Sequence, residues 1–106
     1  MSDVKLMVLY PKPADPKQFD HDYRQHIELL HKKMDIPMDA RPYTITQVLQ
    51  DEQGNTPFYK IFSMPFESAD ILQQTMVTTE MQEVAADAVR ISTGGAPVIL
   101  VGSDML

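Results

Sequence analysis

Hydrophobic residues at the start of the chain form one nearly continuous segment, residues 4–10, which ends at Pro11-Lys12-Pro13. An apolar segment of this length that is closed by prolines is typical of a buried β-strand. A helix is predicted to begin directly after it, because Asp15 can serve as the N-cap and Pro16 suits the first helical position. Gln18 stands three residues after Asp15, in the position that completes a capping box.

Within this helix, apolar and aromatic residues recur every three or four positions, as they do on one face of an amphipathic helix. The stripe consists of Phe19, Tyr23, His26, Ile27 and Leu30. We expect this stripe to pack on a sheet, while the polar residues between its members face solvent. The helix should end before Pro37, because proline disfavours a helical backbone in the residue that precedes it.

Two further strands are predicted as an antiparallel hairpin. Residues 43–50 alternate apolar side chains with Thr and Gln, and residues 58–66 are rich in aromatic residues. The segment between them, residues 51–55, has the polar, glycine-containing composition of a turn. After the hairpin, Ser68 can cap a short helical turn that runs through Leu72.

A second full helix and a last strand follow. The helix should start near Thr78 or Thr79 and should end at Gly94-Gly95. Its apolar stripe is Met81, Val84, Ala85, Ala88 and Val89. Residues 96–101 are apolar at nearly every position and are predicted to form the last strand.

The predicted order of elements is βαββαβ, in a single domain that spans residues 1–106. Right-handed crossovers in this order place both helices on one face of a four-stranded antiparallel sheet. This arrangement is the α+β ferredoxin-like sandwich. The opposite face of the sheet is then left without a helix.

The strands of the predicted sheet are apolar on both sides. Leu6 and Val8 point to one side of the first strand, whereas Met7 and Leu9 point to the other. Covering about ten such side chains contributes ~1.5–3 kcal/mol each, which exceeds an association cost of ~4–15 kcal/mol. We therefore expect a homodimer in which a second copy of the chain covers the open face.

Composition narrows the class of function. The 106 residues include 9 basic and 15 acidic side chains, for a formal net charge of −6. This is the wrong sign for a protein that neutralises nucleic-acid phosphates. No basic amphipathic segment favours a membrane surface, and no apolar segment has the length of a membrane span. The absence of cysteine argues against disulfides and thiolate metal sites and favours a cytoplasmic protein.

Several short motifs follow one another in a particular order along the chain. They are Leu9-Tyr10-Pro11, Phe19-Asp20, Tyr23-x-x-His26 with Leu29, Phe58-Tyr59 with Phe66, Glu67-Ser68-Ala69, Glu80-Met81-Gln82 and Gly94-Gly95. In this order and spacing the chain resembles the EthD family, named from ethyl tert-butyl ether degradation, over nearly its whole length. It departs from the family at Glu28, where many relatives carry a proline.

The resemblance implies a dimeric α+β barrel, in agreement with the two-sided strands. It implies less about chemistry. Some EthD members accompany oxygenase systems, and related dimeric barrels include cofactor-free monooxygenases, polyketide dehydratases and haem-handling enzymes.

His26 is the strongest candidate for a catalytic residue. It is the one strongly polar member of the apolar stripe of the first helix, so its side chain should point into the space between helix and sheet. An imidazole with a pKa of about 6.5 can act as general base or general acid near neutral pH. The alternative is a core histidine whose ring nitrogens are satisfied by neighbouring groups.

Asp22 and Tyr23 are the other two candidates. Asp22 lies four residues before His26, the spacing at which it could hold the imidazole in one tautomer; alternatively it is a solvated surface carboxylate. Tyr23 shares the stripe of His26 and could donate its hydroxyl to a ligand or could simply pack by its ring.

No metal or cofactor is predicted. His21, His26 and His31 are each five residues apart, which separates neighbours by about 140° around a helix, so they cannot converge on one ion. The chain has neither a His-x-x-x-His pair nor a glycine-rich phosphate loop before a helix.

Two functions follow as hypotheses. In the first, a pocket between the sheet and the first helix binds a small apolar or aromatic compound, and His26 moves a proton in a cofactor-free oxygenase or lyase reaction of catabolism or polyketide-like metabolism. In the second, the protein is a non-catalytic accessory or ligand-binding dimer associated with an oxygenase system, and His26 is structural.

Overall fold

A computed structural model describes residues 4–104 of the chain. The elements are β1 (Val4–Pro11), α1 (Pro16–Lys33), β2 (Thr44–Gln47), β3 (Phe58–Phe66), α2 (Ala69–Met76), α3 (Thr79–Ile91) and β4 (Val98–Ser103). The strands form one sheet in the order β2-β3-β1-β4, and every pair of neighbours is antiparallel. The predicted ferredoxin-like fold is confirmed.

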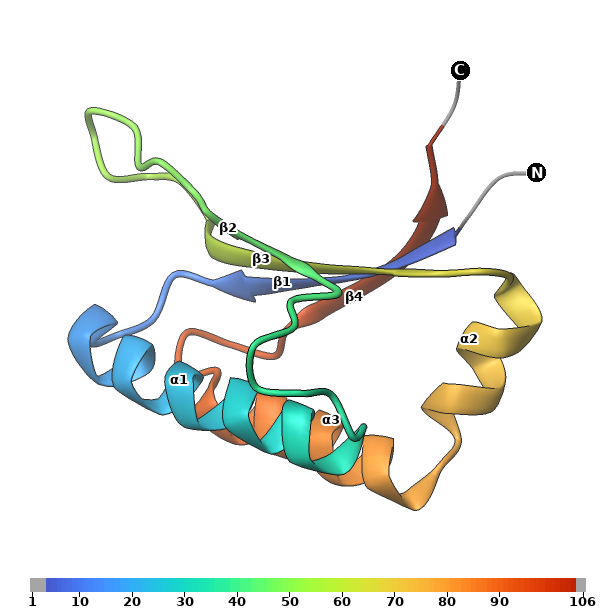
Figure 1. Cartoon of the computed structure of the whole chain (residues 1–106). Helices are drawn as coiled ribbons and strands as arrows, with labels where there is room; N and C mark the ends of the chain where they lie inside the picture. The colour runs from blue at the N-terminus through green and yellow to red at the C-terminus, as the bar shows by residue number, and fades with distance from the viewer. Residues whose placement is uncertain (1–3, 105–106) are drawn as a thin grey trace.

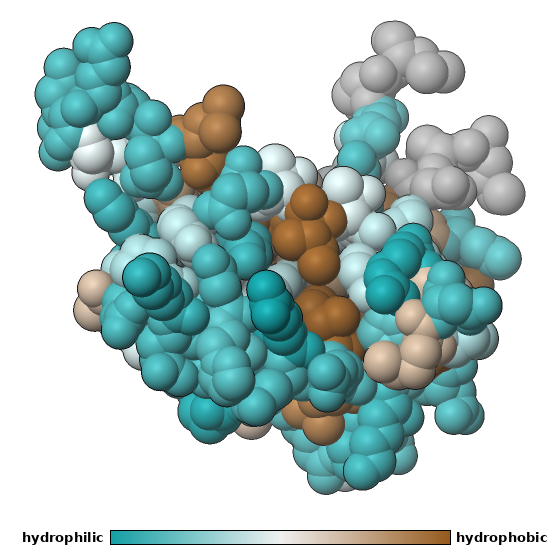
Figure 2. Space-filling model, turned by 60° about the vertical axis from the view of Figure 1, so that its left-hand side comes forward, coloured by the Kyte–Doolittle hydropathy of each residue, from teal (hydrophilic) through white to brown (hydrophobic). Residues whose placement is uncertain are grey.

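The molecule has two layers (Figure 1). Helices α1 and α3 lie side by side beneath the sheet, and α2 links the end of β3 to α3. Within residues 4–104 no helix covers the opposite face of the sheet. The surface turned to the viewer in Figure 2 is mostly hydrophilic, with a strip of hydrophobic side chains through its middle.

The first helix begins as its sequence predicts, with one difference. Asp15 is the N-cap, and its carboxylate accepts a hydrogen bond from the backbone N–H of Gln18 at 3.3 Å. The side chain of Gln18 does not complete the capping box, because its Nε2 donates to Oδ1 of Asp22 at 3.0 Å. The helix ends at Lys33, ahead of Pro37 as expected.

The helices of the second half also start at the predicted caps. Ser68 caps α2, which continues past the predicted end at Leu72 to Met76. Thr78 caps α3 by accepting from the N–H of Met81 at 3.2 Å. Gly94 follows α3 at a point where the backbone passes close to β1, since a Cβ on this residue would lie 2.0 Å from the carbonyl oxygen of Lys12.

The bounds of three strands differ from prediction, and β1 runs one residue further than predicted, to Pro11. β2 covers only Thr44–Gln47. Beyond it the backbone N–H of Val48 still donates to the carbonyl of Tyr59 at 2.9 Å, and Nε2 of Gln50 donates to that of Phe58 at 3.2 Å. β4 begins at Val98 rather than at residue 96 and runs on to Ser103.

The register of the sheet decides which residues face the helices. Leu6 of β1 pairs with Met64 of β3, and both are buried against the helical layer. On the opposite face Leu9 pairs with Val98, which is 39% exposed. The face without helices therefore presents apolar side chains to its surroundings, as the two-sided pattern of the strands predicted.

A buried histidine fixes the connection between α1 and β2. Nε2 of His31 is 2.6 Å from the hydroxyl of Tyr43, and Nδ1 is 3.1 Å from the carbonyl oxygen of Pro37 and 3.3 Å from that of Ile36. His31 is 2% exposed, so both ring nitrogens need a protein partner, and both have one. This histidine has a structural role.

Candidate functional site

A cavity of about 100 Å³ lies between the sheet and the helical layer. Its lining is Leu6, Val8, Tyr10, His26, Leu30, Phe62, Met64, Met76, Met81, Val84, Ala85, Ala88, Val89, Pro97 and Ile99. Only Tyr10 and His26 in this set carry a side-chain nitrogen or oxygen. The site is therefore apolar with two polar groups, the composition typical of a pocket for a small molecule.

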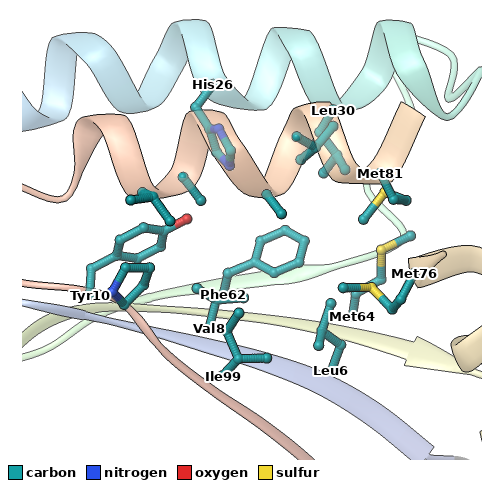
Figure 3. A pocket seen from close by; sticks show the side chains of 15 residues that line it. Leu6, Val8, Tyr10, His26, Leu30, Phe62, Met64, Met76, Met81 and Ile99 are labelled. Atoms are coloured by element: carbon teal, nitrogen blue, oxygen red, sulfur yellow. The ribbon is translucent and has the colours of Figure 1, made fainter. Parts of the chain in front are cut away.

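Three strands and both long helices supply most of the walls, and Met76 of α2 and Pro97 complete them. Residues of β1, β3 and β4 form the wall on the sheet side, and residues of α1 and α3 form the opposite wall (Figure 3). The sequence predicted a pocket between the sheet and the first helix. In the structure, α3 contributes more of the lining residues than α1 does. Val89 and Ile99, which are 59% and 52% exposed, mark the side where the cavity opens.

His26 is held by a carboxylate of the neighbouring helix. Its Nδ1 lies 2.8 Å from Oδ2 of Asp87, and the other carboxylate oxygen of Asp87 accepts from Nε of Arg90 at 2.8 Å. The imidazole is 5% exposed and points from α1 toward the sheet, between Tyr10 and Phe62 (Figure 3). Among residues 4–104, none hydrogen-bonds Nε2 of His26.

The charges of this pair fix the tautomer of the imidazole. Desolvation alone would raise the pKa of Asp87, but hydrogen bonds from His26 and Arg90 outweigh it and lower that pKa. An ionised carboxylate only accepts hydrogen bonds, so Nδ1 of His26 must carry the proton. In the neutral ring the lone pair is then on Nε2, which faces the cavity.

Burial also favours the neutral imidazole. Desolvation lowers the pKa of His26 below its ordinary value of 6.5, and this effect exceeds the opposing contribution of Asp87. At neutral pH the ring is therefore uncharged and its Nε2 can accept a proton. This is the state that a general base requires.

Tyr10 is the second polar group of the cavity. Its ring is 1% exposed and packs edge-on against Phe19 at 5.4 Å and Tyr23 at 5.5 Å between ring centroids. Its hydroxyl points away from the sheet and into the cavity (Figure 3). Desolvation, and to a lesser degree the charge of Asp87, raises the pKa of Tyr10, so the hydroxyl stays protonated and can donate.

The structure does not bring Asp22 to His26. Asp22 accepts from Gln18 on its own helix, and the imidazole turns toward α3 and Asp87 instead. The predicted tautomer-fixing contact is therefore made by a different carboxylate. Spacing along one helix could not reveal Asp87, because it lies 61 residues from His26 in the sequence.

Tyr23 is buried beside the site without lining the cavity. Its ring stacks on Phe19 at 5.7 Å between centroids, and Nζ of Lys60 lies 4.6 Å from the ring centroid. Lys60 in turn donates to Oδ1 of Asp20 at 3.0 Å. The Tyr23 hydroxyl has no hydrogen-bond partner among the described residues, and a role for it in catalysis stays a prediction.

In the part of the chain that the structure describes, no group of three or more His, Cys, Asp or Glu side chains could hold a metal ion. None of the helices in residues 4–104 combines the length and the apolar character that a membrane span needs.

Neither a protein-family model nor a curated protein matches the chain. Among solved structures, a protein of the ethyl tert-butyl ether degradation (EthD) family from Bacillus halodurans matches with a TM-score of 0.78 and 29% sequence identity. The match covers 97% of this chain and 99% of that one.

Two more distant structures show the same fold. A dimeric ferredoxin-like protein of unknown function from Jannaschia sp. matches with a TM-score of 0.66 and 11% identity, over 92% of this chain and 96% of that one. A protein from Caulobacter crescentus, described as a proposed antibiotic biosynthesis monooxygenase, matches with a TM-score of 0.59 and 20% identity, over 99% of this chain and 91% of that one. The chain is therefore a structural match to the EthD family over nearly all of its length, and the resemblance that its motifs indicated is confirmed.

Proposed function

We propose that this protein is a homodimer that binds a small apolar or aromatic compound in the cavity of each protomer, and that Nε2 of His26 removes a proton from the bound compound. Asp87 holds the imidazole in the reactive tautomer. The reaction is a cofactor-free oxygenation or a lyase reaction.

One observation carries this proposal: a buried imidazole is held by a carboxylate at one nitrogen and faces an apolar cavity with the other. The contrast with His31 supports a chemical role. His31 uses both ring nitrogens inside the protein, as a structural histidine does, whereas His26 uses only Nδ1. Nε2 of His26 is therefore free to bind a group of a ligand in the cavity.

Both reactions begin with the same step. Nε2 of His26 takes a proton, and the electron pair of the broken bond stays on the compound. In an oxygenation, the deprotonated carbon gives its electron pair to molecular oxygen and forms a C–O bond, and the resulting peroxide takes the proton from the imidazolium. Loss of a second proton from the same carbon then forms a C=O bond as the O–O bond breaks and water leaves. In a lyase reaction, the electron pair of the deprotonated carbon forms a double bond to the neighbouring carbon. The leaving group departs from that neighbouring carbon and takes the proton from the imidazolium. The description of the Caulobacter crescentus structure as a proposed monooxygenase agrees with the first course.

The volume of the cavity limits the size of the compound. A dry cavity of about 150 Å³ holds benzene in a well-studied case, and larger drug-like ligands need about 300 Å³ or more. At about 100 Å³ with an open side, this cavity suits one ring or a short branched chain.

The first test is binding of fluorobenzene, followed by ¹⁹F NMR. Wild-type protein should bind it saturably. Ala85→Leu, which adds carbon atoms at the cavity wall, should weaken binding by about tenfold or more, because the added side chain takes the space of the ring. Ala86→Leu is the matched control: Ala86 is the next residue of α3 and is exposed, so this variant should bind like the wild type.

Absence of saturable binding, or equal binding by all three proteins, would contradict the pocket. Saturable binding without any proton transfer to His26 would instead support the accessory, ligand-binding function.

A further inference from the structure

The cavity has two chemically different ends. His26 and Tyr10 are at one end, and the thioethers of Met64, Met76 and Met81 are at the other (Figure 3). Methionine side chains are flexible and polarisable, so they adapt to apolar ligands of varied shape. A ligand that fills this cavity should therefore have an apolar body and a polar group at one end only.

The two polar groups differ in what they offer. Nε2 of His26 is an acceptor, since Nδ1 carries the proton that binds Asp87. The Tyr10 hydroxyl is a donor, and no other residue within 4–104 hydrogen-bonds it. Together, these two groups suit a ligand with two neighbouring features. One is an oxygen that accepts a hydrogen bond from the Tyr10 hydroxyl, and the other is a proton that Nε2 of His26 can remove.

Charge excludes acidic ligands. No Lys or Arg lines the cavity. The two nearby cations are engaged elsewhere: Lys60 is bound to Asp20, and Arg90 to Asp87. A carboxylate or phosphate in the cavity would lose its hydration without gaining a counter-charge, which is strongly unfavourable.

We propose that the ligand is a small uncharged ring compound with one oxygen, a cyclic ketone, enol or phenol, and that the hydroxyl of Tyr10 binds this oxygen. This proposal rests on the proposed function and names its substrate class.

Tyr10 then has a defined part in the proton transfer. When Nε2 of His26 takes the proton from the carbon next to the carbonyl, the electron pair of the C–H bond forms a carbon–carbon double bond and the carbonyl oxygen becomes an enolate oxygen. The Tyr10 hydroxyl donates a hydrogen bond to this oxygen, where the negative charge develops. For a phenol or an enol, the O–H proton moves to Nε2 and leaves the same oxyanion. Neither step needs an oxidant or a reductant.

The test compares phenol, toluene and benzoate as probes of the full-length protein. Wild type should bind phenol roughly tenfold more tightly than toluene, the effect of satisfied hydrogen bonds in an apolar site, and should not bind benzoate. Tyr10→Phe keeps the packed ring, so it should remove most of the preference for phenol while toluene binding is unchanged. Tyr59→Phe is the control, because the Tyr59 hydroxyl binds Asp20 outside the cavity.

Equal binding of phenol and toluene by the wild type would overturn the assignment of substrate class and leave the pocket itself intact. A phenol preference that survives in Tyr10→Phe would overturn the role of Tyr10. If neither compound binds, the proposed function fails and this inference with it. The wild-type comparison needs no variant, so it decides the substrate class even if Tyr10→Phe folds poorly.

Discussion

Replacing His26 with glutamine should slow the exchange of the α-hydrogens of cyclohexanone with deuterated water by about 10²–10⁴-fold, the usual contribution of general base catalysis. Cyclohexanone is a single-ring carbon acid of the size of the cavity. Proton removal from it tests the step that an oxygenation and a lyase reaction share, without knowledge of the natural compound. The exchange is followed by ¹H NMR. Free imidazole in solution is the reference for proton transfer without the protein.

Two further variants make this result specific. Asp87→Asn is nearly isosteric, but its amide N–H can donate to Nδ1 and so move the ring proton of His26 to Nε2. Exchange should then fall as well, as it does when a carboxylate that orients a catalytic histidine is replaced. His21→Gln makes the same change as His26→Gln at an exposed position of the same helix, and it should leave exchange unchanged.

Wild-type protein that exchanges cyclohexanone no faster than free imidazole would contradict the proton transfer. Equal exchange rates for His26→Gln and His21→Gln would also contradict it.

Leu100→Glu should convert a dimer into a monomer, raising the dissociation constant by about 10³-fold or more. Leu100 lies on the open face of the sheet, where it pairs with Met7 and is 46% exposed in the protomer. A carboxylate at this position would be buried in an apolar interface without a partner, and an unpaired buried charge is costly. Because Leu100 is only half-buried, the fold of the protomer should be little affected.

The association is measured by sedimentation equilibrium at micromolar concentration. Val77→Glu is the control: Val77 is 64% exposed between α2 and α3, away from the sheet, and this variant should stay dimeric. A wild-type protein that sediments as a monomer would contradict the homodimer.

Local sequence signals predicted most of the fold. Asp15, Ser68 and Thr78 are all N-caps in the structure, because a side chain that accepts from the first turn acts within three or four residues. The length of β2 was not predictable in the same way. The alternation of apolar and polar residues continues through Gln50, but Gln50 meets β3 by its side chain, which donates to the carbonyl of Phe58, and this pattern does not reveal such a contact.

The site was predicted only in part. The helical stripe indicated that His26 faces the sheet, and it does. Its partner could not be found by periodicity, because Asp87 approaches from α3 through tertiary packing. Alternation places Tyr10 on the same side of β1 as Leu6 and Val8, yet nothing in the strand distinguishes an apolar wall residue from a hydroxyl at the end of a cavity.

The state of His26 tests the whole account most directly. The protonation state and the tautomer of the ring can be read from ¹H–¹⁵N NMR spectra of the imidazole over a pH series. The groups that surround the ring are Asp87 and Arg90 on α3 and the Tyr10 hydroxyl on β1. Since desolvation lowers the pKa of His26, the ring should gain its second proton only below pH 6.5. At neutral pH we expect a proton on Nδ1, none on Nε2, and a shift of the Nε2 signal when phenol binds. A ring that is charged at pH 7, or that carries its proton on Nε2, would contradict the account.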